Sequence, residues 1–190
     1  MYRMVKGQRQ DILATAKKAV SRVLEKLGKN EEGKGGYFRL FHIQNPKEGF
    51  IGLTLVCEGW VGGYANVEKR QKYWIISLEK ALRLADKAAL YGDTTSRQSR
   101  DESANHYPGS ILIHCIPDED SDPVWLIFSF SGGLPAEADE AVTIAVAASI
   151  AANSGEVKKL LDLTQNQLAW DLVHDMHPHM DIGPRPEKLL

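Results

Sequence analysis

Apolar residues recur at steps of three and four along several stretches of the chain, which is the spacing of amphipathic helices. The first such stretch runs from Asp11 to Leu27 and ends at Gly28, where a polar, glycine-rich loop begins. A second helix is predicted from Val67 to Ala89. Its apolar stripe consists of Ile75, Leu78, Leu82, Ala85 and Ala89, and the charged residues Lys72, Glu79, Lys80 and Arg83 lie off that stripe.

Four shorter apolar segments predict β-strands that form two pairs. Short segments rich in turn-forming residues join the strands of each pair, which favours antiparallel pairing. The predicted strands are YFRLFHI (37–43), FIGLTLVCEG (50–59), GSILIHCI (109–116) and VWLIFSFS (124–131), with turns at Asn45–Gly49 and Pro117–Pro123. The polar stretch from Tyr91 to Gly109 predicts a functional or mobile loop between the second helix and the third strand.

The last third of the chain predicts two more helices. One begins near Pro135, with acidic residues in its first turn, where the helix dipole favours them. Small residues recur along it, and we expect it to approach the sheet closely: Ala138, Ala141, Ala145 and Ala148. Ser154 and Gly155 break this helix, a final helix is predicted from Glu156 to His174, and the proline-containing tail from Pro178 to Leu190 either hangs free or docks on a neighbour.

The predicted order is α-β-β-α-β-β-α followed by an extra C-terminal helix. Strand pairs joined by short turns indicate an antiparallel sheet flanked by helices, and therefore the α+β class. Residues 1–155 are expected to form the main domain. Residues 156–190 are expected to supply a helix and tail that pack on the same domain or on a partner subunit.

Composition narrows the function classes. The chain has 190 residues, with 23 Lys and Arg against 25 Asp and Glu, which gives a net charge of −2. Proteins that bind nucleic acid or an anionic membrane surface usually carry an excess of basic residues, so neither partner is expected. The first residues show no secretory signal and no apolar run is long enough to span a bilayer, which predicts a cytoplasmic protein.

Strand alternation assigns polar residues to faces of the sheet. Cys57 and Cys115 fall among apolar positions and are expected to be buried packing thiols rather than nucleophiles. Four polar residues are candidates for one shared face, where they would form a small-molecule pocket or be satisfied by neighbouring backbone: His114, Thr54, Ser129 and Ser131. His42 on the first strand could likewise line a small-molecule pocket or be satisfied by neighbouring backbone.

Three further segments could carry chemistry. The Ser131-Gly132-Gly133 turn precedes a helix start, where free N–H groups could hold an anion, although any tight turn also needs glycines. The loop residue His106, with its charged neighbours, could cap a ligand. His174, His177 and His179 could bind a transition metal, although their spacing matches no standard zinc pattern. No catalytic motif is recognised anywhere in the chain.

Residues 108–150, PGSILIHCIPDEDSDPVWLIFSFSGGLPAEADEAVTIAVAASI, preceded by SLEKALRLADKA, resemble the second half of the GlcG/HbpS family. The resemblance extends from about Asp11 to Ala152 and is best from Ser129 to Glu140. The family's Asp-Ala-Gly-Gly turn is replaced here by the residues from Cys57 to Gly63. The resemblance implies a profilin-like or PAS-like domain of a kind that often forms homo-oligomers and that binds heme in some members.

These observations favour a homo-oligomeric small-molecule-binding protein of the GlcG/HbpS type. Heme or a related tetrapyrrole is the ligand that the resemblance implies. His114, His106 and His42 are the first imidazoles to test, with Gly132 and Gly133 as anion-facing backbone. The alternative is a ligand-free oligomeric interaction protein whose interface is the last helix and tail; an enzyme with a cofactor ranks below both.

Overall fold

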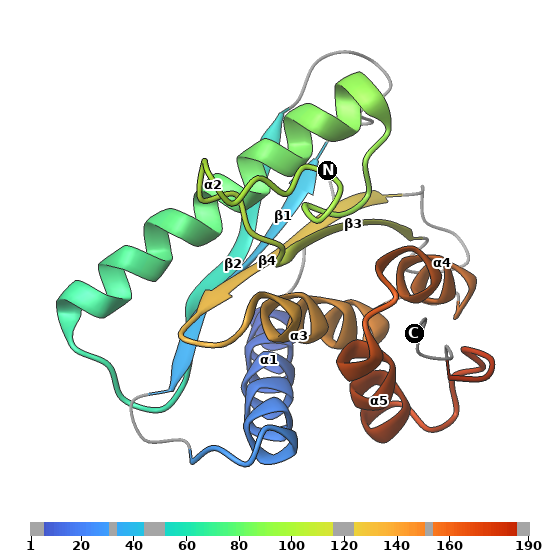
Figure 1. Cartoon of the computed structure of the whole chain (residues 1–190), viewed down its shortest axis with the longest axis horizontal. Coiled ribbons are helices and arrows are strands. Elements are labelled where there is room, and N and C mark those ends of the chain that lie inside the picture. The colour runs from blue at the N-terminus through green and yellow to red at the C-terminus, as the bar shows by residue number, and fades with distance from the viewer. Residues whose placement is uncertain (1–5, 31–33, 44–51, 116–123, 151–153, 186–190) are drawn as a thin grey trace.

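A four-stranded antiparallel sheet with the order β2-β1-β4-β3 forms the centre of the computed structural model (Figure 1). The structure describes residues 6–30, 34–43, 52–115, 124–150 and 154–185. The strands are β1 (Gly35–Ile43), β2 (Leu53–Gly62), β3 (Ser110–Cys115) and β4 (Val124–Gly132). The predicted turns at 45–49 and 117–123 lie outside the described residues.

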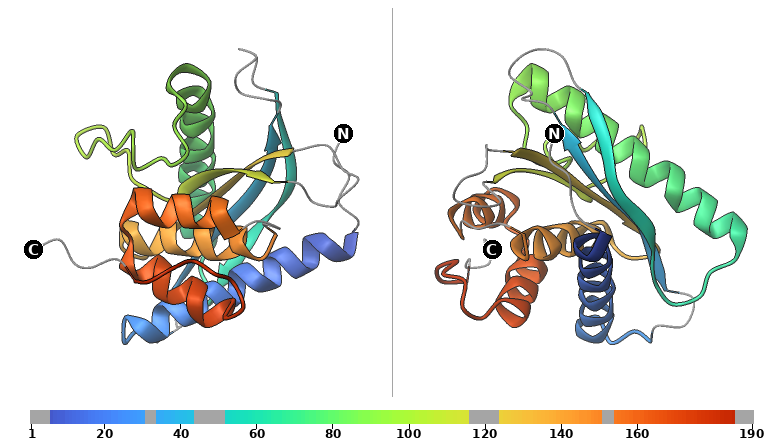
Figure 2. Two further views of the ribbon diagram at one scale, coloured as in Figure 1. Left: turned by 90° about the vertical axis from the view of Figure 1, so that its right-hand side faces the viewer. Right: turned by 180° about the vertical axis from the view of Figure 1, so that it is seen from behind.

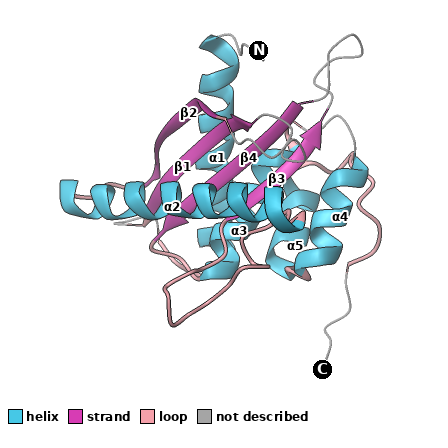
Figure 3. Cartoon of the chain, turned by 90° about the horizontal axis from the view of Figure 1, so that it is seen from above, coloured by secondary structure: helices cyan, strands magenta, loops and turns pink. Residues whose placement is uncertain are grey.

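Helices cover both faces of this sheet. They are α1 (Lys6–Lys26), α2 (Val67–Tyr91), α3 (Ala136–Ala148), α4 (Ser154–Thr164) and α5 (Gln167–Met176). Seen from above, α2 crosses in front of the sheet while α1 and α3 lie behind it (Figure 3). The side views show α4 and α5 on the outer side of α3, on the same side of the sheet as α1 (Figure 2).

The predicted α+β fold and the predicted order of elements from α1 to α3 are confirmed. The larger core lies between the sheet and α1 and α3, where Phe38, Phe128 and Phe130 are fully buried. All four small residues predicted to bring α3 close to the sheet are buried: Ala138, Ala141, Ala145 and Ala148. Among the described ranges, no helix combines the length and apolar character needed to cross a membrane.

A β-bulge corrects the predicted faces of β2. Leu40 pairs with Cys57 and Phe41 pairs with Leu55, so Val56 has no partner on β1. The extra residue interrupts the alternation, and Val56 and Cys57 both join the core beneath α1 and α3. Thr54, which is paired with His42, therefore lies on the face opposite to the one that strict alternation predicts.

Only part of the apolar stripe predicted for α2 faces the sheet: Ala85 is buried there and Leu78 packs beside it. Ile75 and Leu82 are 59% and 46% exposed, whereas Lys80 is 2% exposed. The residues that α2 buries are Ser77, Lys80, Ala81, Leu84, Ala85 and Ala88. The small residues let the helix approach the strands. Ser77 and Lys80 are tolerated on this face because they form hydrogen bonds with polar groups on the sheet.

The single C-terminal helix predicted from Glu156 to His174 is wrong, because the structure has two helices there. Gln165 adopts a positive φ of 50° and ends α4. The side chain of Asn166 then accepts a hydrogen bond from the N–H of Ala169 and caps α5. Helical spacing of the apolar residues continues across this break and conceals it.

Candidate functional site

A cavity of about 730 Å³ lies between α2, the 104–107 segment, the end of β4 and the start of α3. This volume falls in the range of small-molecule sites. Its walls are mostly apolar and aromatic, and its charged groups come from α2 and α3. The lining residues that matter for its chemistry are Tyr73, Ile75, Ile76, Glu79, Lys80, His106, Tyr107, Ser131, Gly132, Leu134 and Asp139.

A buried ion pair between α2 and α3 lines this cavity. Lys80 Nζ lies 2.8 Å from Asp139 Oδ2, and the two side chains are 2% and 5% exposed. Lys80 also donates to the carbonyl oxygen of Phe130 at 3.3 Å. The pair therefore ties α2, β4 and α3 together at one point beside the cavity.

The carboxyl of Asp139 has donors nearby on two elements. Lys80 Nζ of α2 donates to its Oδ2, and the backbone N–H of Gly132 at the end of β4 lies close enough to lower its pKa by hydrogen bonding. Burial raises the pKa of Asp139 to about 6, although the charge of Lys80 and its hydrogen bond oppose that rise. At neutral pH the carboxyl is thus mainly ionised and is held by groups of both α2 and β4.

Close packing beneath Lys80 fixes the position of its amine. Gly109 has a φ of +130°, and a Cβ at this position would lie 2.7 Å from Lys80 Nζ and 2.6 Å from the carbonyl oxygen of Phe130. Only a residue without a side chain fits this space. Gly109 stands where the loop after α2 enters β3, so the loop and the ion pair depend on the same close contact.

The cavity mouth carries aromatic and weakly paired polar groups. Burial raises the pKa of Tyr73, and the negative charge of Asp139 raises it further, so the phenol stays protonated at neutral pH. His106 Nε2 lies 3.8 Å from Glu79 Oε1. Tyr107 is 37% exposed. The mouth can therefore offer both ring surfaces and hydrogen-bonding groups to a ligand.

Glu140, beside Asp139 in α3, belongs to a separate and fully paired network. Its side chain is completely buried and receives two hydrogen bonds from Arg97 Nε and one from Arg97 Nη2. Thr95 Oγ1 and Asn166 Nδ2 donate to the same carboxylate. This network holds the start of α3, the loop after α2 and the N-terminus of α5 in fixed positions.

Arg39 is a third buried charge, on the α2 side of β1. It pairs with Glu58 at 2.9 Å and donates to Ser77 Oγ at 3.1 Å. Its guanidinium also lies over the rings of Tyr37 and Trp74. These contacts balance the charge of Arg39 with groups of the protein itself, so Arg39 anchors α2 to the sheet.

Three of the residues predicted from sequence line the cavity: His106, Ser131 and Gly132. Gly133 follows directly, and a Cβ there would lie 3.3 Å from the Tyr73 hydroxyl. Sequence reasoning missed Lys80 and Asp139 as site residues. Little in the sequence marks Lys80 and Asp139 as site residues, because a Lys on a helix and an Asp in a first helical turn are normally exposed.

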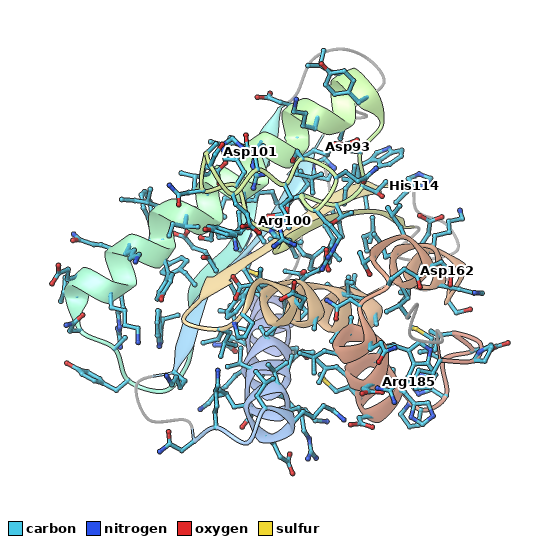
Figure 4. The ribbon with its side chains drawn as sticks, in the orientation of Figure 1. Asp93, Arg100, Asp101, His114, Asp162 and Arg185 are labelled. Atoms are coloured by element: carbon cyan, nitrogen blue, oxygen red, sulfur yellow. The ribbon has the colours of Figure 1, made fainter. Side chains whose placement is uncertain are left out.

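The other predicted pocket residues lie elsewhere. Ser129 shares the α2 face of the sheet with Ser131, but it is buried and bonds to Ser110 Oγ and the carbonyl oxygen of Ser77. The ring of His114 lies 4.4 Å from that of Trp125. In Figure 4, His114 lies well apart from the loop residues Arg100 and Asp101.

His42 and Thr54 lie on the opposite face of the sheet from His114, Ser129 and Ser131. They pair with each other across β1 and β2, and His42 pairs with Leu126 of the larger core. Burial lowers the pKa of His42, so its imidazole is neutral at pH 7. The predicted shared face therefore contains three of its four proposed members, and Thr54 is excluded from it by the bulge.

The C-terminal histidines do not converge. His174 stacks on Trp170 with ring centroids 5.2 Å apart, and His177 Nε2 lies 3.0 Å from the carbonyl oxygen of Ala145. The rings of His177 and His179 are 6.4 Å apart in an edge arrangement. Within the described ranges, no group of three or more His, Cys, Asp or Glu is placed to hold a metal. A metal bound by His174, His177 and His179 stays a prediction without support from this arrangement.

Cys57 has the environment of a packing thiol. It is 7% exposed within the larger core, and burial raises its pKa to about 11. The prediction for the side chain of Cys115 lies outside what the structure describes.

Comparison of the chain with protein-family models, with curated proteins and with solved structures finds no match. The fold and the cavity thus define an α+β domain with a ligand-sized pocket. The similarity to the GlcG/HbpS family stays a prediction from the sequence.

Proposed function

We propose that this protein binds a small organic molecule in the cavity between α2, α3 and the 104–107 segment. The observation that carries the proposal is the cavity of about 730 Å³, whose mostly apolar lining includes the buried Lys80–Asp139 ion pair. A volume of this size lies in the range of small-molecule sites.

The surrounding surface supports binding rather than a purely structural role. Ile75, Ile76 and Leu134 supply apolar wall, and Tyr73 and Tyr107 supply rings with polar ends. This combination of apolar wall and a few convergent polar groups is typical of small-molecule sites. The residues suggest no reaction, so the proposal is restricted to binding.

Heme is the ligand that the GlcG/HbpS resemblance implies, and the cavity matches it only in part. His106 is the one imidazole among the lining residues, and it could serve as an axial ligand. The buried Lys80–Asp139 pair matches no part of a porphyrin face, which is apolar. A smaller ligand with a polar end fits these residues better than a tetrapyrrole does.

The test combines native mass spectrometry, absorption spectra on heme addition, and a small-molecule screen monitored by protein NMR. Chemical-shift changes that map to Tyr73, Lys80 and Asp139 would support the proposal. The variant Ala136→Phe, which narrows the cavity, should abolish them, whereas Ala14→Phe on the exposed side of α1 should not. Shift changes that persist in Ala136→Phe would contradict the proposal, and a Soret band lost in His106→Ala would establish heme.

A second candidate function, assembly with another copy of this chain, is favoured by the outward face of α2. Ile75, Leu78 and Leu82 form an apolar groove there, edged by both acidic and basic residues: Glu79, Arg83, Asp86 and Lys87. Charges of both signs beside one apolar stripe allow two copies to pair by a two-fold axis. The interface expected at the last helix is less suitable, because Leu172 and Val173 of α5 are fully buried within the larger core of the same chain.

A further inference from the structure

An aromatic patch lies where β2 leads into α2. The ring centroids of Trp60, near the end of β2, and Tyr73 of α2 are 6.3 Å apart. The guanidinium of Arg70 lies over the rings of both Trp60 and Tyr64, 5.8 Å from each centroid. Tyr64 is 79% exposed. The patch therefore begins at a projecting tyrosine and continues from the strand to the helix.

A second pair of rings extends the patch along α2 and β1. Trp74 follows Tyr73 in the helix and is 41% exposed. Arg39 lies over the rings of Trp74 and Tyr37, and Tyr37 pairs with Trp60 across β1 and β2. Five aromatic residues thus make up the patch: Tyr37, Trp60, Tyr64, Tyr73 and Trp74. They are half of the chain's 4 Trp and 6 Tyr, so these side chains are concentrated at one place.

The composition of this surface is that of a protein interface. Val67 and Ile75, on either side of the patch, are 73% and 59% exposed and add aliphatic area. Isolated exposed apolar residues are ordinary, whereas a contiguous group of them marks an interaction site. Trp, Tyr and Arg are also the residues that contribute most to binding at protein interfaces.

The charge beside the patch is positive. The start of α2 carries three basic residues and one acidic residue: Lys69, Arg70, Lys72 and Glu68. The N-terminal end of the helix dipole has the same sign. Glu58, on β2, is already paired with Arg39 at 2.9 Å. A surface that complements the patch therefore carries acidic side chains.

The same charge makes a second copy of the chain an unsuitable partner for this patch. In a two-fold contact the patch would meet itself, and its basic residues would face one another. The outward face of α2 differs, because acidic and basic residues both border its apolar groove. The two surfaces of α2 thus suit different partners.

Single-stranded nucleic acid suits the patch less well than a protein does. Proteins that bind single strands leave ring faces open for bases and follow the backbone with a positively charged groove. Here Arg70 and Arg39 already lie over the rings, and the charge of Arg39 is balanced by Glu58. The whole chain carries a net charge of −2, without the excess of basic residues that phosphate binding requires.

We infer that the aromatic patch binds an acidic segment of another protein. The partner's apolar side chains pack on Tyr64 and Trp74, and its carboxylates lie beside Arg70. The patch is separate from the proposed ligand site, because Tyr73 is the one member of the patch among the cavity's lining residues.

Selection from a library of random peptides on the intact protein tests this inference. We expect enrichment of peptides that combine Asp or Glu with apolar residues. A selected peptide should shift the indole N–H signals of Trp60 and Trp74 in NMR spectra, but not those of Trp125 and Trp170, which lie outside the patch. Enrichment of basic peptides, binding away from the patch, or no enrichment at all would overturn the inference.

Two exposed tyrosines near opposite ends of α2 provide matched variants. Tyr64 is 79% exposed with Arg70 over its ring, and Tyr91 is 70% exposed with Lys87 over its ring. Tyr64→Ala should weaken binding of the selected peptide at least about tenfold, whereas Tyr91→Ala should change it less than about twofold. Arg70→Glu should also weaken it, with Lys17→Glu on the exposed side of α1 as control. Equal effects within either pair would overturn the inference.

Two further measurements separate the remaining outcomes. An oligonucleotide of thymidines is the competing probe, and tighter binding of it than of the peptide at Trp60 and Trp74 would identify a nucleic-acid surface and overturn the inference. Ala136→Phe, which narrows the cavity, should leave peptide affinity unchanged. The peptide-binding surface and the ligand cavity therefore succeed or fail independently.

Discussion

Asp139 and Glu140 are adjacent acidic residues in α3, and each forms a buried ion pair with a cation from a different part of the chain. Asp139 pairs with Lys80 of α2, and Glu140 pairs with Arg97 of the following loop. Glu140 is enclosed by donors from the loop and from α5, whereas Asp139 lines the cavity. Two chemically similar residues thus differ in what lies beside them: one is surrounded by protein, and the other is at the wall of the candidate site.

The Glu140 network predicts a large stability effect. Glu140→Gln removes the charge that three donors share and should lower the free energy of unfolding by about 2–3 kcal/mol. Urea denaturation would measure this change. Glu25→Gln, which removes an exposed pair with Arg22, is the control and should cost less than about 0.5 kcal/mol. Equal effects of the two substitutions would contradict the structural role of Glu140.

The raised pKa of Asp139 predicts a specific pH dependence. Its carboxyl should titrate near pH 6 in the folded protein, because burial opposes its ionisation. The native state then holds this proton to higher pH than the unfolded chain does, so the Asp139 contribution to stability falls as pH rises from about 4 to about 6. NMR of the carboxyl carbon measures the midpoint directly.

Asp101 is the internal control for that titration. It is exposed, and hydrogen bonds from Ser103 lower its pKa below the usual value of 3.8. The two carboxyls should therefore titrate in opposite directions from that value within one sample. Titration of Asp139 near pH 4 would contradict a pKa raised by burial.

Gly109 and Gly92 both adopt positive φ, +130° and +76°, but only Gly109 is tightly packed. A Cβ at Gly92 meets nothing within 4 Å. Gly92→Ala should cost about 1 kcal/mol, as a strained backbone alone does. Gly109→Ala should cost at least about 1 kcal/mol more and should shift the NMR signals of Lys80. Equal costs would refute the close contact beneath the amine.

The burial of Cys57 predicts an unreactive thiol. In a Cys115→Ser background, Cys57 should react with a disulfide reagent at pH 8 much more slowly than it does in the unfolded protein, because burial raises its pKa to about 11 and limits access. Rates would be followed by absorbance with and without denaturant. Comparable rates in both states would show that the thiol is accessible in the native fold.

Assembly through α2 predicts that a charge on its apolar stripe keeps the chain monomeric. Leu82→Lys should shift the mass measured by light scattering from an oligomer to a monomer. Leu163→Lys on α4 is the control, because its side chain has nearly the same exposure, 47% against 46%. A monomeric wild-type protein, or equal behaviour of both variants, would remove support for this interface.

The sequence predicts the order of elements because each depends on local periodicity and turn chemistry. It predicts three lining residues of the cavity, since His106 lies in a long polar loop and Ser131 and Gly132 lie in a recognisable turn. Local periodicity could not predict which face of α2 packs on the sheet, or on which face of the sheet the side chains of β2 lie. Lys80 is buried by a partner 59 residues away, and the bulge at Val56 leaves no signature in the alternation of apolar residues.

The strand order also governs how the chain can reach its native state. The β1–β2 and β3–β4 pairs join neighbours in sequence, whereas β1 pairs with β4, bringing Gly36 opposite Gly132. Closing that long loop carries an entropic cost before any contact across the central pair is gained. The joining of the two hairpins is therefore the step expected to limit the folding rate. Because the Lys80–Asp139 pair links the segment between the hairpins to the helix that follows them, the cavity is completed only after this step.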